Sequence, residues 1–561
     1  MTDTNQTDKI NAEVISVFPN KVRISVDNLE DFQVADEKLR VGSYLQIADN
    51  DDCKLMAIIE NFSIEVGVDK EGKPTRGYII EAQPLGMIID GKFERGGDSI
   101  AIPPKSVQPA KTEDISKIFE ESIAEKDKFE FASLVANEVI KVPVNGNKFF
   151  NKHIAIIGST GSGKSHTVAK IIQKAIAGKN GEYEGLNNSH VIIFDIHSEY
   201  RSAFPNANYI DVENMVLPYW LLNSDELQEL FIETEANDHN QRSLFKDAVV
   251  ESKKNHYKGD ATIKERIHFD SPYYFDIDDV LAKANSENTK MIDTGEVYAS
   301  GEKKGQAKRV KGSLNGFLHN FINRMEVKLH DKRLEFLLGD KAKKITFEDT
   351  LKQFLGYGTS QSNVTILDLS GIPFDVLSIS VSLISRILFE YGYYYKKVLE
   401  AESAACNNDI PLLLVYEEAH KYVPNSDMAK YRASRDSIER IAKEGRKYGV
   451  SLLLASQRPS EISDTIFAQC SNYVAMRLTN PNDQACVKKL LPDTLGDLIN
   501  KLPSLKAGEG LLIGDAVVLP SVVKIDLCDP APSSSDIPYW DLWKDRWKDL
   551  PVDKIKSLWC K

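Results

Sequence analysis

A glycine-rich loop between an apolar run and an amphipathic run constrains this chain more than any other part of its sequence. Residues 153–157 (HIAII) are apolar and β-branched, which predicts a buried strand. After the loop, apolar side chains recur at helical spacing from Val168, which predicts a helix with one buried face. The loop itself reads GSTGSGKS and fits G-x-x-x-x-G-K-[ST] at every fixed position. Strand, loop and helix together predict a parallel α/β sheet with a phosphate site at the carboxyl ends of its strands.

The residue types in this loop suit the phosphates of ATP. Glycines let backbone N–H groups converge on phosphate oxygens without a Cβ in the way. The helix that follows adds the positive end of its dipole. Lys164 is expected to reach the β- and γ-phosphates, and Ser165 to ligate Mg²⁺. The predicted nucleotide contacts are Gly158, Ser159, Thr160, Gly161, Ser162, Gly163, Lys164, Ser165 and His166.

A P-loop needs an acidic partner at the end of another strand, and residues 412–418 (LLLVYEE) provide it. Four apolar residues predict a buried strand, and Glu417 and Glu418 follow it. We expect Glu417 to complete the Mg²⁺ shell and Glu418 to polarise the attacking water. Separate roles are needed because adjacent carboxylates raise each other's pKa unless a cation lies between them. A solvated, acidic helix start is the alternative.

Two more strand ends bring polar side chains to the same edge. Gln457 follows the apolar residues 451–455 and is expected to sense the γ-phosphate or to orient water. Asp195 follows the apolar residues 191–194 and is a candidate site residue. An ordinary turn remains the alternative for Gln457, and a helix cap or turn for Asp195.

These pieces, in this order, resemble the HerA family of ATPases within the broader HerA/FtsK group. The resemblance rests on the His and strand before the P-loop and on four further elements. They are D-x-x-x-E-Y at 195–200, E-E-A-H at 417–420, G-R-K-Y-G at 445–449 and S-Q-R-P at 456–459. The likeness covers about residues 11–525.

The resemblance implies more than the spacing does. It implies a homo-hexameric ring that couples ATP hydrolysis to translocation on double-stranded DNA. A nuclease or other effector partner is expected, in DNA end processing or antiviral defence. ATP sites at subunit interfaces imply an arginine supplied in trans, which contributes about 10³–10⁵ in rate. Arg446, within G-R-K-Y-G, is the favoured candidate, with Arg440 and Lys152 as other basic residues; a surface ion pair is the alternative for each.

Two rival functions remain open at this point. One is a hexameric scaffold that assembles and activates a partner enzyme, with ATP as a switch. The other is a soluble secretion or conjugation ATPase of the same superfamily. The intact Glu417/Glu418 pair favours turnover, but it does not select the cargo.

The organisation along the chain predicts a RecA-like core interrupted by an insertion. Residues 1–110 carry short alternating strands, typical of a small β-barrel, with separate strands at 78–84 and 87–89 and a Pro-rich linker at 102–110. Residues 111–220 and 351–525 would form the two parts of the ATPase core, with helices on both faces of the sheet. Residues 221–350 would be a helical insertion, and 526–561 a C-terminal tail.

Two segments lie beyond the motifs. A basic stretch in the insertion is expected to be a flexible loop that either contacts DNA or is merely solvated; it contains Lys303, Lys304, Lys308, Arg309 and Lys311. The tail carries Trp540, Trp543, Trp547 and Trp559. These side chains are expected either to cap a neighbouring subunit or recruit a partner, or to pack on their own domain.

Composition sets outer limits on these readings. The net charge of −13 argues against a surface coated with nucleic acid, although a narrow channel needs only a basic lining. No apolar run approaches the ~18 residues of a membrane helix, and the N-terminus is polar, so a cytoplasmic protein without a membrane segment is expected. The six scattered cysteines predict reduced thiols.

Overall fold

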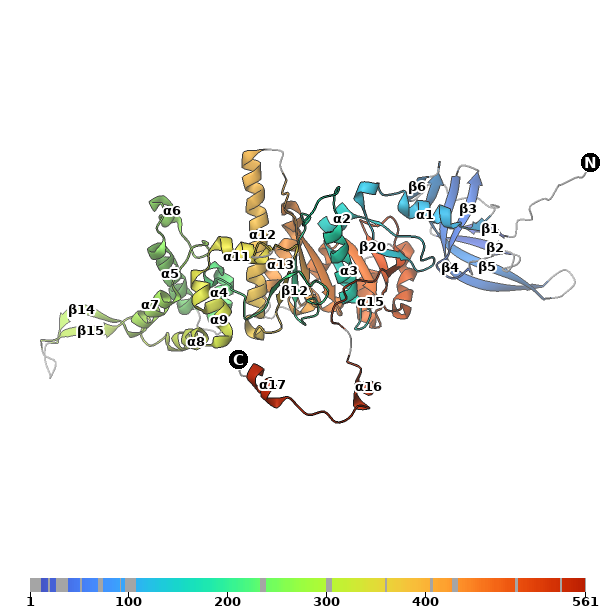
Figure 1. Cartoon of the computed structure of the whole chain (residues 1–561). Helices are drawn as coiled ribbons and strands as arrows, with labels where there is room; N and C mark the ends of the chain where they lie inside the picture. The colour runs from blue at the N-terminus through green and yellow to red at the C-terminus, as the bar shows by residue number, and fades with distance from the viewer. Residues whose placement is uncertain are drawn as a thin grey trace, which may run out of the picture.

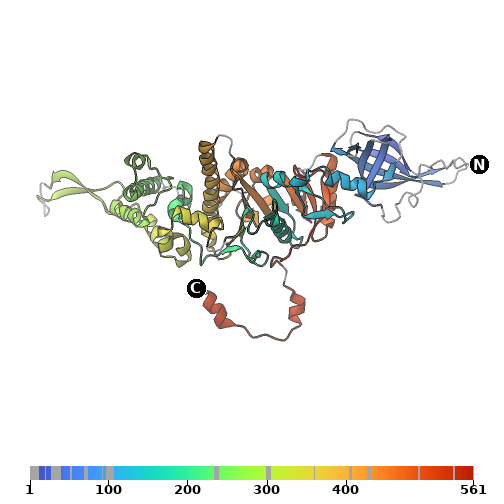
Figure 2. The same ribbon diagram turned by 45° about the horizontal axis from the view of Figure 1, so that its top comes forward.

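The structure is a computed structural model. It describes residues 12–18, 21–26, 39–50, 53–68, 74–90, 92–95, 107–232, 239–298, 305–358, 361–403, 407–425, 432–489, 493–534 and 537–559. Figures 1 and 2 show an elongated chain with a β-rich region at one end, a mixed sheet in the middle and helices at the other end. The C-terminal segment runs alongside this row. The predicted fold, a parallel α/β core with an N-terminal β-region and a helical insertion, is confirmed.

The N-terminal region is an antiparallel sheet with its own apolar core. Its strands lie in the order β1-β2-β5-β4-β3-β7, and β6 pairs with β5. They are β1 (Ala12–Val17), β2 (Val22–Val26), β3 (Tyr44–Asn50), β4 (Cys53–Val68), β5 (Pro74–Ile89), β6 (Lys92–Arg95) and β7 (Val107–Pro109).

Two expectations about this region were wrong. The strands predicted at 78–84 and 87–89 are one strand, β5, which pairs with β4 across an irregular register near Ala57. The linker predicted at 102–110 ends in β7, which pairs with β3 and buries Val107 in the sheet's core. Proline is tolerated there because β7 is an edge strand. Residues 102–106 lie outside the described residues.

The central sheet has ten strands in the order β13-β16-β12-β17-β18-β11-β19-β20-β21-β9. The first seven are parallel, and β20, β21 and β9 continue antiparallel. Their bounds are β9 (Ala132–Leu134), β11 (Ile154–Ile157), β12 (His190–Asp195), β13 (Asn208–Ile210), β16 (Val364–Asp368), β17 (Leu412–Tyr416), β18 (Val450–Ser456), β19 (Asn472–Met476), β20 (Glu509–Gly514) and β21 (Ser521–Ile525).

Helices cover both faces of this sheet. On one face, Ile154 and Ile156 pack with α3 (Lys164–Ala177), whose apolar stripe includes Val168 and Ile172. On the other face, Ala155 and alternate residues of β12 and β17 pack with α12 (Phe374–Glu402) and α13 (Arg432–Glu444). Because successive side chains of a strand point to opposite faces, a strand buried on both sides reads as a continuous apolar run.

The insertion is helical, as predicted, and ends in a hairpin. Its helices are α4 (Ser224–Phe231), α5 (His239–His256), α6 (Ala261–Arg266), α7 (Ile277–Thr289), α8 (His319–Leu329), α9 (Glu335–Leu338), α10 (Asp340–Lys344) and α11 (Phe347–Phe354). Lys308, Arg309 and Lys311, predicted to lie in a loop, are instead on a strand of a hairpin formed by β14 (Met291–Val297) and β15 (Ala307–Lys311), exposed on both faces. It projects from the end of the molecule opposite the N-terminal sheet (Figure 1).

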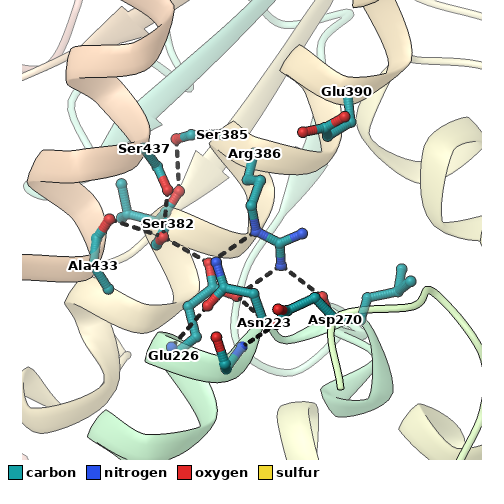
Figure 3. Close-up of polar contacts among 12 residues, drawn as sticks. Asn223, Glu226, Asp270, Ser382, Ser385, Arg386, Glu390, Ala433 and Ser437 are labelled. Atoms are coloured by element: carbon teal, nitrogen blue, oxygen red, sulfur yellow. Dashed lines mark hydrogen bonds and ion pairs between the residues drawn. The ribbon is translucent and has the colours of Figure 1, made fainter. Parts of the chain in front are cut away.

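A buried ion pair joins the insertion to the core (Figure 3). Glu226 of α4 is fully buried and accepts from Arg386 of α12 at 2.7 Å (Nη2) and 3.2 Å (Nε). Ser382 of α12 donates to the same carboxylate at 2.7 Å, and the backbone N–H of Asn223 donates at 2.8 Å. Both carboxylate oxygens are therefore partnered.

The C-terminal segment first follows the core and then leaves it. Lys170 and Gln173 of α3 donate to the carbonyls of Leu527 and Pro530, each at 2.7 Å. Beyond this, α16 (Tyr539–Trp543) and α17 (Val552–Trp559) expose their aromatic side chains, and Trp547 in the segment between them is 98% exposed. The tail's tryptophans thus do not pack on their own domain. No helix among the described residues is long and apolar enough to span a membrane. Cys470, Cys486 and Cys528 carry free thiols.

Candidate functional site

The P-loop is hydrogen-bonded to the ends of β18 and β19, the strands on either side of β11. The N–H of Gly158 donates to Ser456 O at 3.2 Å, and the N–H and hydroxyl of Ser159 both donate to Arg477 O at 2.8 and 2.9 Å. Gly163 has φ = 102°, and a Cβ there would lie 3.2 Å from the backbone nitrogen of Gly508. Glycine is therefore required at this position, both for its backbone conformation and for the close approach of a neighbouring segment.

The loop ends at the N-terminus of α3 with Lys164 and Ser165. Lys164 is only 9% exposed, and its Nζ donates to Ser159 O at 3.3 Å. Burial lowers the pKa of Lys164, while the charges of Glu418, Glu417 and Glu199 act in the opposite direction. The hydroxyl of Ser165 donates to Glu199 Oε2 at 2.7 Å. The end of the loop therefore faces a group of carboxylates.

Glu417 follows β17 directly and is 5% exposed. Its Oε2 has no hydrogen-bond partner within the described part of the chain. Burial, reinforced by the nearby charges of Glu418, Glu199 and Asp195, raises the pKa of Glu417 to about 9. An orphaned buried carboxylate oxygen near Lys164 of the P-loop is what a bound divalent cation would satisfy, so Glu417 fits Mg²⁺ bound together with a nucleotide.

Glu418 lies in a left-handed backbone conformation (φ = 49°) and is 3% exposed. Its carboxylate accepts a hydrogen bond from Gln457 Nε2, and Oε2 lies 3.2 Å from His420 Nδ1. Burial acts to raise the pKa of Glu418, but the contacts with His420 and Gln457 and the charge of Lys164 outweigh it and leave the pKa below its ordinary value. Glu418 is thus placed to act as an acceptor.

Gln457 connects the acidic pair to the P-loop. Its Oε1 accepts from Thr160 Oγ1 at 2.6 Å, while its Nε2 donates to Glu418. This contact arises because Ile157 and Ser456 pair in register, so that β11 and β18 end side by side. The predicted P-loop, Glu418 and Gln457 are therefore brought into one connected group.

Asp195 is fully buried at the end of β12 and has a different setting. Its carboxylate accepts the backbone N–H groups of His197, Glu199 and Tyr200 at 3.0–3.2 Å. This is the turn arrangement left open as its alternative. Through these bonds Asp195 fixes the loop that carries Glu199 toward Ser165.

The predicted trans-acting residues and His166 have unequal surroundings. Arg440 pairs with Glu390 at 2.7 Å, and Lys152 pairs with Asp515 at 2.7 Å. Arg446 is exposed and makes no ion pair with any residue that the structure describes. His166, in the first turn of α3, has its Nδ1 3.2 Å from Cys528 Sγ.

Strand β15 lies at the end of the molecule far from α3, the helix that begins at the P-loop (Figure 1). Lys308, Arg309 and Lys311 are exposed on β15, and Lys308 pairs with Glu296 at 3.0 Å. Lys303 and Lys304 lie outside the described residues.

Sequence reasoning did not select Glu199, His197 or His420 as site residues. Glu199 and His420 stand inside the elements D-x-x-x-E-Y and E-E-A-H, so their motifs carried the signal. His197 occupies a variable position of D-x-x-x-E-Y, between Asp195 and Glu199, so its motif carried no signal. It comes close to Glu417 only because β12 pairs with β17.

The chain is similar to the following known proteins. Residues 129–388 match the model described as helicase HerA, central domain. A probable helicase of Methanocaldococcus jannaschii is 26% identical over 553 residues, covering 93% of each chain. The DNA double-strand break repair helicase HerA of Saccharolobus solfataricus is 27% identical over 450 residues, 79% of this chain and 77% of that one. Among solved structures, the bacterial conjugative coupling protein TrwB covers 70% of this chain and 89% of its own, at 11% identity and a TM-score of 0.42.

Proposed function

Because this chain carries the central domain of the HerA family of P-loop ATPases, we propose that it is a ring-forming, ATP-driven translocase on double-stranded DNA. The observation that carries the proposal is the connected group of Thr160, Gln457 and Glu418 beside Lys164. A group that links the phosphate loop to a buried acceptor suits hydrolysis, since a site for binding alone needs no such acceptor.

The proposed chemistry is mostly positioning and charge stabilisation. The backbone N–H groups of the P-loop and Lys164 bind the phosphates, and Ser165 and Glu417 would hold Mg²⁺. The cation would neutralise charge on the phosphates. Glu418 accepts a proton from the attacking water, and Gln457 relays the state of the γ-phosphate between Glu418 and Thr160.

The ring is proposed to complete each site with Arg446 from a neighbouring subunit. Its exposure and its lack of an ion pair with described residues leave the guanidinium available to an adjacent chain. Arg440 and Lys152 are weaker candidates because Glu390 and Asp515 already pair with them. Lys164→Ala subunits mixed with Arg446→Ala subunits should regain part of the turnover if the arginine acts across an interface.

Double-stranded DNA is the proposed track, because relatives such as the Saccharolobus solfataricus protein are DNA double-strand break repair helicases. DNA would be held through phosphates with little reading of sequence. The hairpin residues Lys308, Arg309 and Lys311, together with Lys303 and Lys304, are proposed phosphate contacts. A nuclease or other effector is the proposed partner, in end processing or antiviral defence.

The test is steady-state ATPase activity of the full chain with and without linear double-stranded DNA, alongside its mass in solution. Strong stimulation in a particle of about six chains is the expected result for a phosphate-tracking motor. Turnover indifferent to DNA would contradict the motor and favour the partner-activating scaffold or the secretion ATPase. Neutralising the hairpin cations should reduce the salt dependence of DNA binding by about one unit per lost phosphate contact; an unchanged salt slope would remove the hairpin from the track.

A further inference from the structure

Three ligand-bearing side chains converge beside the P-loop from two neighbouring strand ends. One ligand atom each from His197, Glu417 and Glu418 lies within 4.8 Å of the other two. β12 and β17 are paired in parallel, with Phe194 opposite Tyr416, so the residues after both strands meet at one edge. The convergence is therefore a product of the sheet register rather than of a mobile surface loop.

The second observation is the orphaned oxygen of Glu417. Glu417 is only 5% exposed, and its Oε2 has no hydrogen-bond partner among the residues that the structure describes. Burying a carboxylate oxygen without a partner is costly, and buried charges are normally paired or bound to a metal. The charge of Lys164 acts on both glutamates, and the charges of Glu199 and Asp195 act on Glu417 in the opposite direction. The pocket thus gathers several carboxyl groups around one lysine.

We propose that His197, Glu417 and Glu418 form a divalent-cation site in the nucleotide-free chain, and that this site prefers Mn²⁺ to Mg²⁺. Two carboxylate oxygens alone would suit Mg²⁺, which takes oxygen ligands in near-ideal octahedral geometry. An imidazole nitrogen favours transition metals, and affinity for nitrogen and oxygen sites is low for Mg²⁺ and rises along the first-row series. The inference rests on the proposed function in one respect only, that Glu417 is also the expected ligand of the nucleotide-bound metal.

The site differs from the proposed nucleotide-bound metal shell in its third ligand. That shell uses Ser165, whose hydroxyl is engaged with Glu199 at 2.7 Å. His197 instead lies in the turn after β12, where it is exposed and its backbone N–H donates to Asp195 Oδ1 at 3.2 Å. Glu418 would offer Oε2, which lies 3.2 Å from His420 Nδ1 in this structure, while its other oxygen, Oε1, still accepts from Gln457.

The test is a Mn²⁺ titration of the full-length, nucleotide-free chain by electron paramagnetic resonance, with Mg²⁺ as competitor. The wild-type chain should bind about one Mn²⁺ per protomer in this pocket and release it only at a large excess of Mg²⁺. His197→Ala should weaken Mn²⁺ binding at least about tenfold and narrow the preference over Mg²⁺. Glu417→Gln should weaken the binding of both Mn²⁺ and Mg²⁺. His319→Ala, which removes another exposed histidine far along the insertion, is the matched control and should change neither.

A spectroscopic readout keeps the proposal testable even if a variant folds poorly. Electron spin-echo modulation of Mn²⁺ bound to the wild-type chain should show a directly coordinated nitrogen. Absence of that nitrogen signal, or equal Mn²⁺ affinity in the wild-type and His197→Ala chains, would overturn the site. Because no nucleotide or DNA is present, the titration tests the cation site separately from the proposed function. A chain without DNA-stimulated turnover can still bind Mn²⁺, and a chain with such turnover can lack the Mn²⁺ site.

Discussion

Glu226, at the junction of α4 and α12, and Glu417, at the end of β17, are both buried carboxylates, yet their surroundings differ. Glu226 is fully buried, and each of its oxygens accepts hydrogen bonds, from Arg386, Ser382 and the backbone of Asn223. Glu417 is 5% exposed and leaves Oε2 without a partner among the described residues. One carboxylate is complete within the chain, and the other is complete only with something added.

This difference separates structural charge from functional charge. A satisfied ion pair contributes to how the insertion is oriented on the core, and its partners are lost together when the chain unfolds. An orphaned carboxylate costs stability in the free chain, and that cost is recovered when a cation or nucleotide binds. The contrast can be broken if the two kinds of residue respond alike to substitution.

The largest expected effect is on catalysis at the P-loop site, where Glu418 lies next to the orphaned Glu417. Glu418→Gln should lower ATP turnover by about 10²–10⁴, because the amide cannot accept the proton of the attacking water. Nucleotide affinity should be largely retained, since the P-loop and Lys164 are untouched. The measurements are kcat and the dissociation constant of a fluorescent ATP analogue. Glu444→Gln, at the exposed end of α13, is the control; near-normal turnover in Glu418→Gln would remove that carboxylate from its assigned role.

The next largest effect is on the free energy of unfolding, through the buried ion pair of Arg386 and Glu226. Arg386→Met should cost about 3–5 kcal/mol, because it leaves Glu226 charged and unpaired in the interior. The double variant Arg386→Met/Glu226→Met should recover much of this loss. Urea unfolding combined with hydrogen exchange at α4 and α12 would measure it. Arg440→Met breaks an exposed pair with Glu390 and should cost no more than about 1 kcal/mol; equal losses in Arg386→Met and Arg440→Met would erase the distinction.

The sequence predicted most of what lies on a strand end and little of what depends on register. The P-loop, Glu417 and Glu418 could be identified because motif residues and the apolar run before them are covalent neighbours. The bonds from Gln457 to Thr160 and from Ser165 to Glu199 join segments far apart in the chain, and only the pairing of β11 with β18 and the turn built on Asp195 place them together.

The errors have a physical origin as well. The hairpin of β14 and β15 is exposed on both faces, so it lacks the alternation of buried and exposed positions that marks a strand in sequence. β7 was predicted to belong to a linker because residues 102–110 are rich in proline, whereas Val107 inserts into the core of the N-terminal sheet. The role of Arg446 stays a prediction, because it depends on a neighbouring copy of the chain and a single chain does not show which groups meet across that interface.

His153 extends the comparison to a group that belongs with Glu226. It is 2% exposed, Nε2 donates to Ala442 O at 3.0 Å, and Nδ1 accepts from the N–H of Leu452 at 3.0 Å. Burial lowers the pKa of His153 to about 4, despite the bond to Ala442. The fold therefore requires the neutral ring, and the stabilisation is full above the ordinary pKa of about 6.5 and is lost as the pH falls toward about 4.

His153→Asn should consequently be less stable than the wild-type chain at pH 7 and should lose less stability on acidification. The gap between the two chains should narrow between about pH 6.5 and pH 4, by up to about 3 kcal/mol. Unfolding midpoints at several pH values would measure the gap, and the other titrating groups cancel because both chains share them. A gap that stays constant with pH would mean that the ring nitrogens do not hold a neutral histidine.

The smallest expected effect sets Glu417 directly against Glu226 by the same substitution. Glu226→Gln replaces oxygens that accept from a charged guanidinium, and should cost about 1–3 kcal/mol. Glu417→Gln breaks no hydrogen bond at Oε2 and removes a carboxylate from beside Glu418. With chelator present, its effect on the free energy of unfolding should therefore stay below about 1 kcal/mol in either direction.

Added Mn²⁺ should then raise the unfolding temperature of the wild-type and Glu226→Gln chains but not that of Glu417→Gln, because a ligand that binds the folded state stabilises it by mass action. If Glu417→Gln were as destabilising as Glu226→Gln without metal, the orphaned oxygen would have a structural partner after all, and its value as a marker of the site would be lost.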